Sequence, residues 1–73
     1  MLMYYVYVLK INNDFYIGCT EDLKRRLKQH KVKGKVILIY YESYLLKKLA
    51  INREKKLKYY GSAWRALKKR ITA

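Results

Sequence analysis

Five side chains with complementary chemistry are spread along the 73-residue chain: Tyr7, Tyr16, Arg26, His30 and Glu54. Phenol and imidazole groups can donate and accept protons. A guanidinium keeps its positive charge and offers donors in a planar fork that suits a phosphate. A lone carboxylate among lysines and arginines, as at position 54, either pairs with a cation or binds a metal ion. From the residue types alone, the ion pair is the commoner of the two.

The two tyrosines fall in segments that predict the strands of a β-hairpin. Residues 3–10 and 15–19 are rich in β-branched and aromatic side chains. Between them, the cluster Asn12-Asn13-Asp14 favours a turn, because Asn and Asp tolerate positive φ angles. We therefore expect the two segments to pair as neighbouring antiparallel strands.

The register of this hairpin decides whether the tyrosines can act together. With an even-numbered loop, Leu9 pairs with Tyr16 and Tyr7 pairs with Gly18, so that both tyrosines share one face. The missing side chain of Gly18 then leaves open space beside Tyr7, and two phenols beside a gap suit a reaction site. The residues also permit a plainer interpretation, in which tyrosine is an ordinary strand residue and glycine marks a bulge or a close backbone approach. A slip of one residue would place the tyrosines on opposite faces.

A helix is expected directly after the hairpin, with Thr20 as its N-cap. Leu23 and Leu27 form an apolar stripe at the i, i+4 spacing of one helix face. Arg26 and His30 have the same spacing and flank that stripe on one side. The helix should cover the hairpin, so that a fixed cation and an imidazole lie beside the tyrosines.

The rest of the chain predicts one more strand and two more helices. The continuous apolar run at residues 36–41 is typical of a strand buried on both faces, at the centre of a sheet. Residues 44–58 predict a helix with Ser43 as its N-cap and with Gly61 ending it in a left-handed conformation. Residues 62–70 predict the last helix.

The second helix is expected to bury one arc of side chains at the 3.6-residue period. The members of this arc are Leu45, Leu46, Leu49, Ala50 and Leu57. Arg53 projects toward the arc and either pairs with Glu42 or extends its charge into solvent. Trp64 of the last helix is expected in the core. The element order β-β-α-β-α-α predicts an α+β fold with a three-stranded, mainly antiparallel sheet flanked by helices.

Composition favours a polyanionic partner. Eighteen Lys and Arg residues face five Asp and Glu, which gives a formal charge of +13, more than the roughly 2–8 units that a small domain needs for solubility. Nucleic acid is the expected partner, and no membrane partner is expected. The length predicts a single domain over residues 1–73. The lone Cys19 favours a reducing, cytoplasmic compartment, and one Cys with one His excludes a four-ligand zinc site.

Taken in order, these segments resemble the GIY-YIG nuclease domain over nearly the whole chain. The first triplet carries Tyr and Val where the family name has Gly and Ile, a common variation. The motifs that carry the resemblance are Tyr5-Val6-Tyr7, Tyr16-Ile17-Gly18, Thr20, Asp22-Leu23-Lys24-Arg25-Arg26-Leu27, His30, Tyr41-Glu42 and Arg53-Glu54-Lys55-Lys56-Leu57-Lys58. One triplet alone would be a weak signal, but the ordered set is specific, and its last two motifs resemble those of the small stand-alone bacterial members of the family.

The resemblance implies a metal-dependent DNA endonuclease that acts on branched or damaged DNA in repair or recombination. Glu54 would hold one Mg²⁺ or Mn²⁺ ion, and Arg26 would bind the scissile phosphate. Tyr7 or Tyr16 would be the general base, and His30 would orient the water or contact the phosphate. A phenol with a pKa of about 10 needs its pKa lowered by roughly 3 units to work near pH 7. A charge of +13 with a metal ion nearby is expected to supply that shift.

Two other functions remain open at this point. A catalytically weak or inactive nucleic-acid-binding module on the same fold would bind DNA without cutting it. An accessory subunit would dock on a larger complex, for which an exposed patch at residues 40–44 would be the expected surface. Protein partners stay open.

Overall fold

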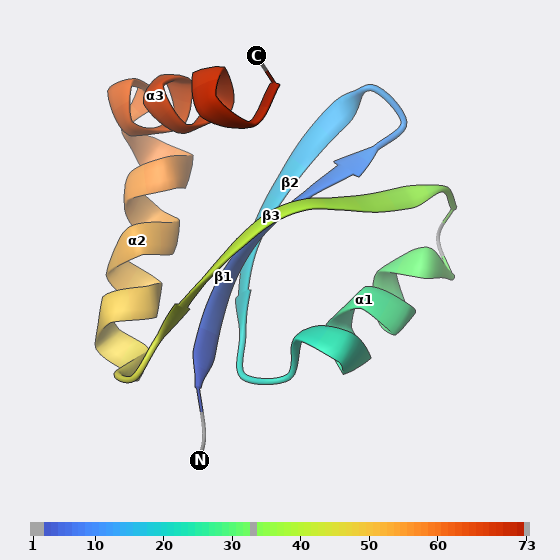
Figure 1. Ribbon diagram of the computed structural model, residues 1–73, viewed down its shortest axis with the longest axis horizontal. Helices are drawn as coiled ribbons and strands as arrows, with labels where there is room; N and C mark the ends of the chain where they lie inside the picture. Colours follow the sequence, from blue (N-terminus) through green and yellow to red (C-terminus); the bar gives the residue numbers. More distant parts are fainter. Residues whose placement is uncertain (1–2, 33, 73) are drawn as a thin grey trace.

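The computed structural model describes residues 3–32 and 34–72, and residues 1, 2, 33 and 73 lie outside that description. The order of elements is the predicted β-β-α-β-α-α (Figure 1). The strands are β1 (Tyr4–Ile11), β2 (Asp14–Thr20) and β3 (Val36–Tyr44), and the helices are α1 (Leu23–Lys31), α2 (Lys47–Tyr59) and α3 (Gly61–Thr72). The predicted α+β fold, with a three-stranded antiparallel sheet flanked by helices, is therefore confirmed. None of the described helices is long and apolar enough to cross a lipid bilayer.

The hairpin has the predicted register. Tyr7 pairs with Gly18, and Leu9 pairs with Tyr16. The turn is made by Asn12 and Asn13, and Asn12 has a φ of 57°, in the left-handed region that Asn tolerates better than most residues. A two-residue loop fixes which residues of β1 and β2 pair, and this register places Tyr7 and Tyr16 on one face of the sheet.

The order of strands in the sheet is β2-β1-β3, so the prediction that residues 36–41 form the central strand is wrong. The central strand is β1, because it pairs with β2 on one side and with β3 on the other. Its residues 6–9 are all buried. β3 is an edge strand, and its Ile37 and Tyr41 are 53% and 54% exposed, because one long edge of it faces solvent.

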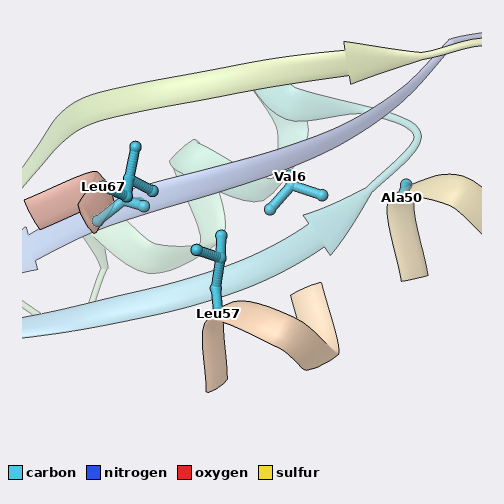
Figure 2. Packing of buried hydrophobic residues seen from close by; sticks show 5 residues of the cluster. Val6, Ala50, Leu57 and Leu67 are labelled. Carbon is cyan, nitrogen blue, oxygen red and sulfur yellow. The ribbon is translucent and has the colours of Figure 1, made fainter. Parts of the chain in front are cut away.

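The two faces of the sheet are covered by different helices. Figure 1 shows α1 on one side of the sheet and α2 with α3 on the other. Val6 and Val8 of β1 form the core with Ala50 and Leu57 of α2 and Leu67 of α3. Figure 2 shows the side chains of Leu57 and Leu67 pointing toward the sheet beside Val6. Because successive strand residues alternate between faces, Tyr7 points to the other side, toward α1.

The last helix closes one end of this core. Trp64 packs against the core cluster, as predicted, and its ring lies 5.4 Å from that of Phe15 of β2, centroid to centroid, in an edge-to-face arrangement. Gly61 is the first residue of α3 and does not have a positive φ, so it does not end α2 as a left-handed cap. The preceding Tyr60, in an extended conformation, closes α2 with a hydrogen bond from its N–H to the carbonyl of Lys56.

Two helix starts differ from the predictions. Asp22, rather than Thr20, caps α1: its Oδ1 accepts a hydrogen bond from the N–H of Arg25. The Thr20 hydroxyl instead accepts one from the N–H of Asp22 and shapes the turn before the helix. α2 begins at Lys47 rather than residue 44, because β3 continues through Tyr44 where Ser43 was expected to cap the helix.

The late start of α2 also changes which of its side chains are buried. Ala50 and Leu57, seven residues apart, are buried as predicted. Leu45, Leu46 and Leu49 are 63%, 51% and 45% exposed, so the prediction that they belong to a buried arc is wrong. Leu45 and Leu46 lie in the bend between β3 and α2 and do not follow the helical period at all.

Candidate active site

Tyr7 lies at the centre of the candidate site. It belongs to the central strand, and its side chain is 1% exposed. Its ring crosses directly over Gly18 of β2: a Cβ atom at position 18 would lie 2.5 Å from Cζ of Tyr7 and would also overlap its hydroxyl. A real Cβ never comes so close, so only glycine fits at position 18. The open space expected beside Tyr7 is filled by the ring of Tyr7 itself, and the plainer interpretation of Gly18, a close backbone approach, is correct.

Tyr7, Tyr16 and His30 form one contact cluster. The hydroxyl of Tyr7 lies 3.2 Å from Nε2 of His30, within hydrogen-bond distance. The ring of Tyr16 lies 4.8 Å from that of His30 and 6.2 Å from that of Tyr7, centroid to centroid. Tyr16 is 41% exposed, whereas Tyr7 is buried. The two phenols, which the sequence could not distinguish, therefore have different surroundings.

The pKa of Tyr7 is raised to about 12, mainly because the phenol is buried. Interaction with Tyr16 and with the carboxylate of Glu54 raises it further, while the positive charge of Arg26 lowers it. The net charge of +13 was expected to help lower this pKa, but burial outweighs the guanidinium. At neutral pH Tyr7 is therefore a neutral phenol that can donate a hydrogen bond to His30 and accept another.

Arg26 reaches the site from the first half of α1. Its charge acts on the phenol of Tyr7, and its side chain is exposed. It also lines a pocket of about 260 Å³ where β2 leads into α1; the pocket wall is formed by Tyr4, Cys19, Thr20, Glu21, Asp22, Arg25, Arg26 and Lys47. Within residues 3–32 and 34–72, Arg26 makes no ion pair. Its guanidinium can therefore bind an anion from solution.

Glu54 reaches the site from α2. Its carboxylate acts on the pKa of both Tyr7 and Cys19, which places it near the edge of β2. Its Oε2 lies 3.3 Å from Nζ of Lys58, one helical turn further on, and its side chain is 21% exposed. The ion pair expected from the residue types is thus present, but a partly exposed pair of this kind contributes little to stability and can exchange.

A metal ion at Glu54 would have few protein ligands. No group of three or more His, Cys, Asp or Glu residues that could hold a metal occurs in the described part of the chain. A single accessible carboxylate does fit Mg²⁺, which keeps several of its waters and is held through one or two carboxylates together with substrate phosphates. The donor set therefore matches a hard cation that binds together with a phosphate.

A second polar cluster, only partly foreseen from the sequence, fixes the helix that carries Glu54. Glu42 accepts hydrogen bonds from the hydroxyls of Tyr40 (2.6 Å) and Tyr44 (2.5 Å), and Nε of Arg53 lies 2.8 Å from its Oε1. Of the two alternatives for Arg53, pairing with Glu42 is therefore correct. Because Arg53 directly precedes Glu54 on α2, this cluster ties the helix to β3 next to the site. The alternation of Tyr40, Glu42 and Tyr44 along one strand face was the available signal.

The same cluster sets the ionisation of its members. Burial pushes the pKa of Glu42 upward, but hydrogen bonds from Tyr40, Tyr44 and Arg53 and the charge of Arg53 outweigh it, so the pKa is lower than usual.

Tyr40 and Tyr44 are half-buried because they turn toward Glu42, and of the nearby tyrosines Tyr41 is the exposed one. The segment 40–44 is therefore not the continuous exposed patch that a docking surface would need.

Comparison with known proteins gives a family and a fold. The family described as "GIY-YIG catalytic domain" matches residues 3–58. Among solved structures, the chain is similar to the UPF0213 protein BH0048 from Bacillus halodurans, determined by solution NMR. The TM-score is 0.66 and the identity 22%, with 96% of this chain and 87% of that chain covered. No curated protein matches the chain.

The family match covers more than half of the chain and includes all five candidate site residues: Tyr7, Tyr16, Arg26, His30 and Glu54. Nucleases of this family typically use a divalent metal ion. The chain belongs to the GIY-YIG family, whose catalytic domain is that of a nuclease that acts on phosphodiester bonds.

Proposed function

We propose that the protein is a metal-dependent DNA endonuclease with Tyr7, His30, Arg26 and Glu54 as its working residues. The observation that supports this most strongly is the position of the Tyr7 phenol. It is buried over Gly18, lies 3.2 Å from Nε2 of His30, and is influenced by the charges of both Arg26 and Glu54. A proton acceptor, a phosphate-binding cation and a metal-binding carboxylate are the groups that phosphodiester hydrolysis requires.

In this proposal Tyr7, rather than Tyr16, accepts the proton of the attacking water. A phenol with a pKa of about 12 is protonated at pH 7, so it can act as a base only if it loses its own proton at the same time. His30 provides the acceptor for that proton at Nε2, 3.2 Å away. The proton of water passes to Oη of Tyr7, and the Tyr7 proton passes to Nε2 of His30. The water oxygen forms a bond to phosphorus, and the bond from phosphorus to the leaving sugar oxygen breaks. The leaving oxygen keeps the electron pair of that bond and takes a proton from solvent.

Arg26 and Glu54 help to neutralise the negative charge of the phosphate in the same step. Arg26 binds the non-bridging oxygens of the scissile phosphate, and removal of such a donor typically lowers the rate by about 10²–10³. Glu54 would hold Mg²⁺ or Mn²⁺ in place of its partner Lys58. Such an ion would supply positive charge to stabilise the transition state and the leaving oxygen. Tyr16 packs against His30 and holds the imidazole in place.

The test is a nicking assay on supercoiled plasmid and on labelled single-stranded, duplex and branched or damaged oligonucleotides, with Mg²⁺ or Mn²⁺. We expect cleavage by the wild type, at least 10²-fold slower cleavage by Glu54→Gln and Arg26→Ala, and unchanged cleavage by the matched surface variants Asp14→Asn and Lys24→Ala, whose side chains are exposed and line no pocket of the site. Calorimetric titration with Mn²⁺ should show weaker binding to Glu54→Gln. Equal rates in wild type, Glu54→Gln and Arg26→Ala would refute the site.

A second candidate function is nucleic-acid binding without cleavage, and the charge of the chain favours it. Eighteen basic residues against five acidic ones promote binding to DNA whether or not the site is active. This alternative predicts steeply salt-dependent binding and no turnover on any substrate in the same panel. Turnover by the wild type that is lost in Glu54→Gln excludes it.

A further inference from the structure

Two hollows lie along the edge strand β2, one on each side of Gly18. The first is the pocket of about 260 Å³ that contains Cys19 and Thr20 from β2 and Lys47 from α2. The second contains residues 15–17 of β2 together with Leu57 and Lys58 of α2. α2 therefore runs antiparallel to β2, with its first residue at one hollow and its last turns at the other. Tyr7, above Gly18, lies between them.

The first hollow, which we call the basic pocket, holds three cations. Arg25 and Arg26 come from α1, and Lys47 comes from α2. No ion pair involves any of the three in the described part of the chain. Of the two acids in the wall, Asp22 uses Oδ1 to cap α1, and Glu21 is exposed. Three cations from two separate helices thus converge on one hollow.

The basic pocket adjoins the site where cleavage is proposed. Arg26 lines the pocket and also acts on the phenol of Tyr7. Lys47 and Glu54 are seven residues apart, so they share one face of α2 with an axial separation of about 10 Å. A phosphate follows every 3.4 Å or so along the axis of one strand of a duplex. A strand with one phosphate at Arg26 therefore has another within reach of Lys47.

We propose that the basic pocket binds a second phosphate of the cleaved DNA strand, close to the scissile one, through Lys47 and Arg25. This inference rests on the proposed function, because Arg26 must hold the scissile phosphate. The pocket volume equals about eight to nine water molecules, which is enough for a phosphodiester group and part of its sugar. The Thr20 hydroxyl in the same wall already donates its hydrogen to the carbonyl of Asp22, so the proposed phosphate contacts come from the charged side chains.

The experiment pairs a protein variant with a DNA variant. A fluorescein-labelled oligonucleotide carries one uncharged methylphosphonate in place of one phosphate, and the position is moved along the strand. Binding is measured by fluorescence anisotropy in EDTA, where cleavage is not supported. With the wild type, we expect two positions at which the replacement weakens binding by about tenfold, as expected for a lost charge-assisted hydrogen bond.

Lys47→Ala should weaken binding to unmodified DNA by about tenfold and abolish the effect at one of these two positions only. Arg26→Ala should abolish the effect at the other. The salt dependence of log K should also fall by about 0.7–0.9 in Lys47→Ala, the value for one lost phosphate contact. Lys48→Ala is the matched control: it is exposed on the same turn of α2, does not line the pocket, and should leave both positions sensitive.

The inference is overturned if Lys47→Ala keeps both sensitive positions, if Lys48→Ala has the same effect, or if no DNA binding is found. In a duplex, sensitivity to methylphosphonate on the uncleaved strand alone would also overturn it, because the pocket would then hold the other strand. The binding assay does not depend on turnover. Protein that binds with the two-position pattern but never cuts refutes the nuclease proposal and supports a two-phosphate site.

Discussion

The hydroxyl of Tyr7 lies 3.2 Å from Nε2 of His30, although 23 residues separate them in the chain. The contact joins the central strand to α1, which lies on that side of the sheet (Figure 1). It pairs a buried phenol, whose pKa is raised to about 12, with a side chain that can take its proton. In the proposed reaction it is the route by which a neutral tyrosine acts as a base.

The first prediction concerns which phenol acts. Tyr7→Phe removes the hydroxyl that contacts His30 but keeps the ring over Gly18, so we expect kcat to fall by about 10²–10⁴ with little change in DNA binding. Tyr16→Phe should have a smaller effect, because phenylalanine keeps the ring that packs against the imidazole of His30. Single-turnover cleavage and anisotropy measure the two quantities. A larger loss in Tyr16→Phe than in Tyr7→Phe would assign the base to Tyr16 instead.

The second prediction is a loss of stability in alkali. The pKa of Tyr7 is raised from 10.0 to about 12, so between these pH values the folded protein retains a proton that the unfolded chain releases. The stabilisation is complete below pH 10 and falls as pH rises to about 12, by about 2–3 kcal/mol in total. Urea unfolding at pH 8 and at pH 11.5 measures it. Tyr7→Phe should lose less stability over this interval, and an equal loss in both proteins would contradict the assignment.

The third prediction concerns the open backbone of β2. Gly18→Ala places a methyl group against the ring of Tyr7, at 2.5 Å from Cζ, so the phenol must move. We expect a loss of about 1–3 kcal/mol of stability, as for overpacked cores, together with a loss of cleavage. Gly61→Ala is the matched control, because nothing lies within 4 Å of a Cβ at that position. Thermal unfolding distinguishes the two, and a Gly18→Ala protein with wild-type stability and activity would be evidence against the close approach.

The fourth prediction concerns the cluster around Glu42. Glu42→Gln leaves the half-buried guanidinium of Arg53 without its ion pair and should cost about 1–3 kcal/mol, measured by urea unfolding at pH 7. Because the folded pKa of Glu42 is lowered, its stabilisation is present above about pH 4.5 and is lost as pH falls through the folded pKa. The gap between wild type and variant should therefore shrink in acid. Glu21→Gln, at an exposed acid, should show neither effect.

The register of the hairpin could be predicted because it depends on local properties. A two-residue turn between two strands fixes their pairing, and the two-residue period then places Tyr7 opposite Gly18. The strand order could not be predicted in the same way. Both β1 and residues 36–41 are apolar runs, and burial is decided by how many strands pair with each. That number depends on contacts between distant segments.

The helix boundary at α2 shows a similar limit. Ser43 and the leucines after it fit a helix start, yet β3 continues to Tyr44. Tyr40, Glu42 and Tyr44 share one strand face, on which Glu42 accepts hydrogen bonds from both tyrosines and from Arg53 of α2. A hydrogen-bonded cluster across two elements thus outweighed local propensity. The members of the candidate site could be named from the sequence motifs. The contact between Tyr7 and His30 could not be predicted, because it depends on how α1 lies over the sheet.

The central position of β1 also has a consequence for how the protein is made. This strand precedes both of its partners along the chain, and one of them, β3, ends at residue 44. During synthesis, residues 6–9 of β1 cannot be flanked by strands on both sides until the ribosome has also made β3. A nascent chain that stalls in that interval presents an unpaired apolar strand edge, the kind of surface to which chaperones bind and from which aggregates grow.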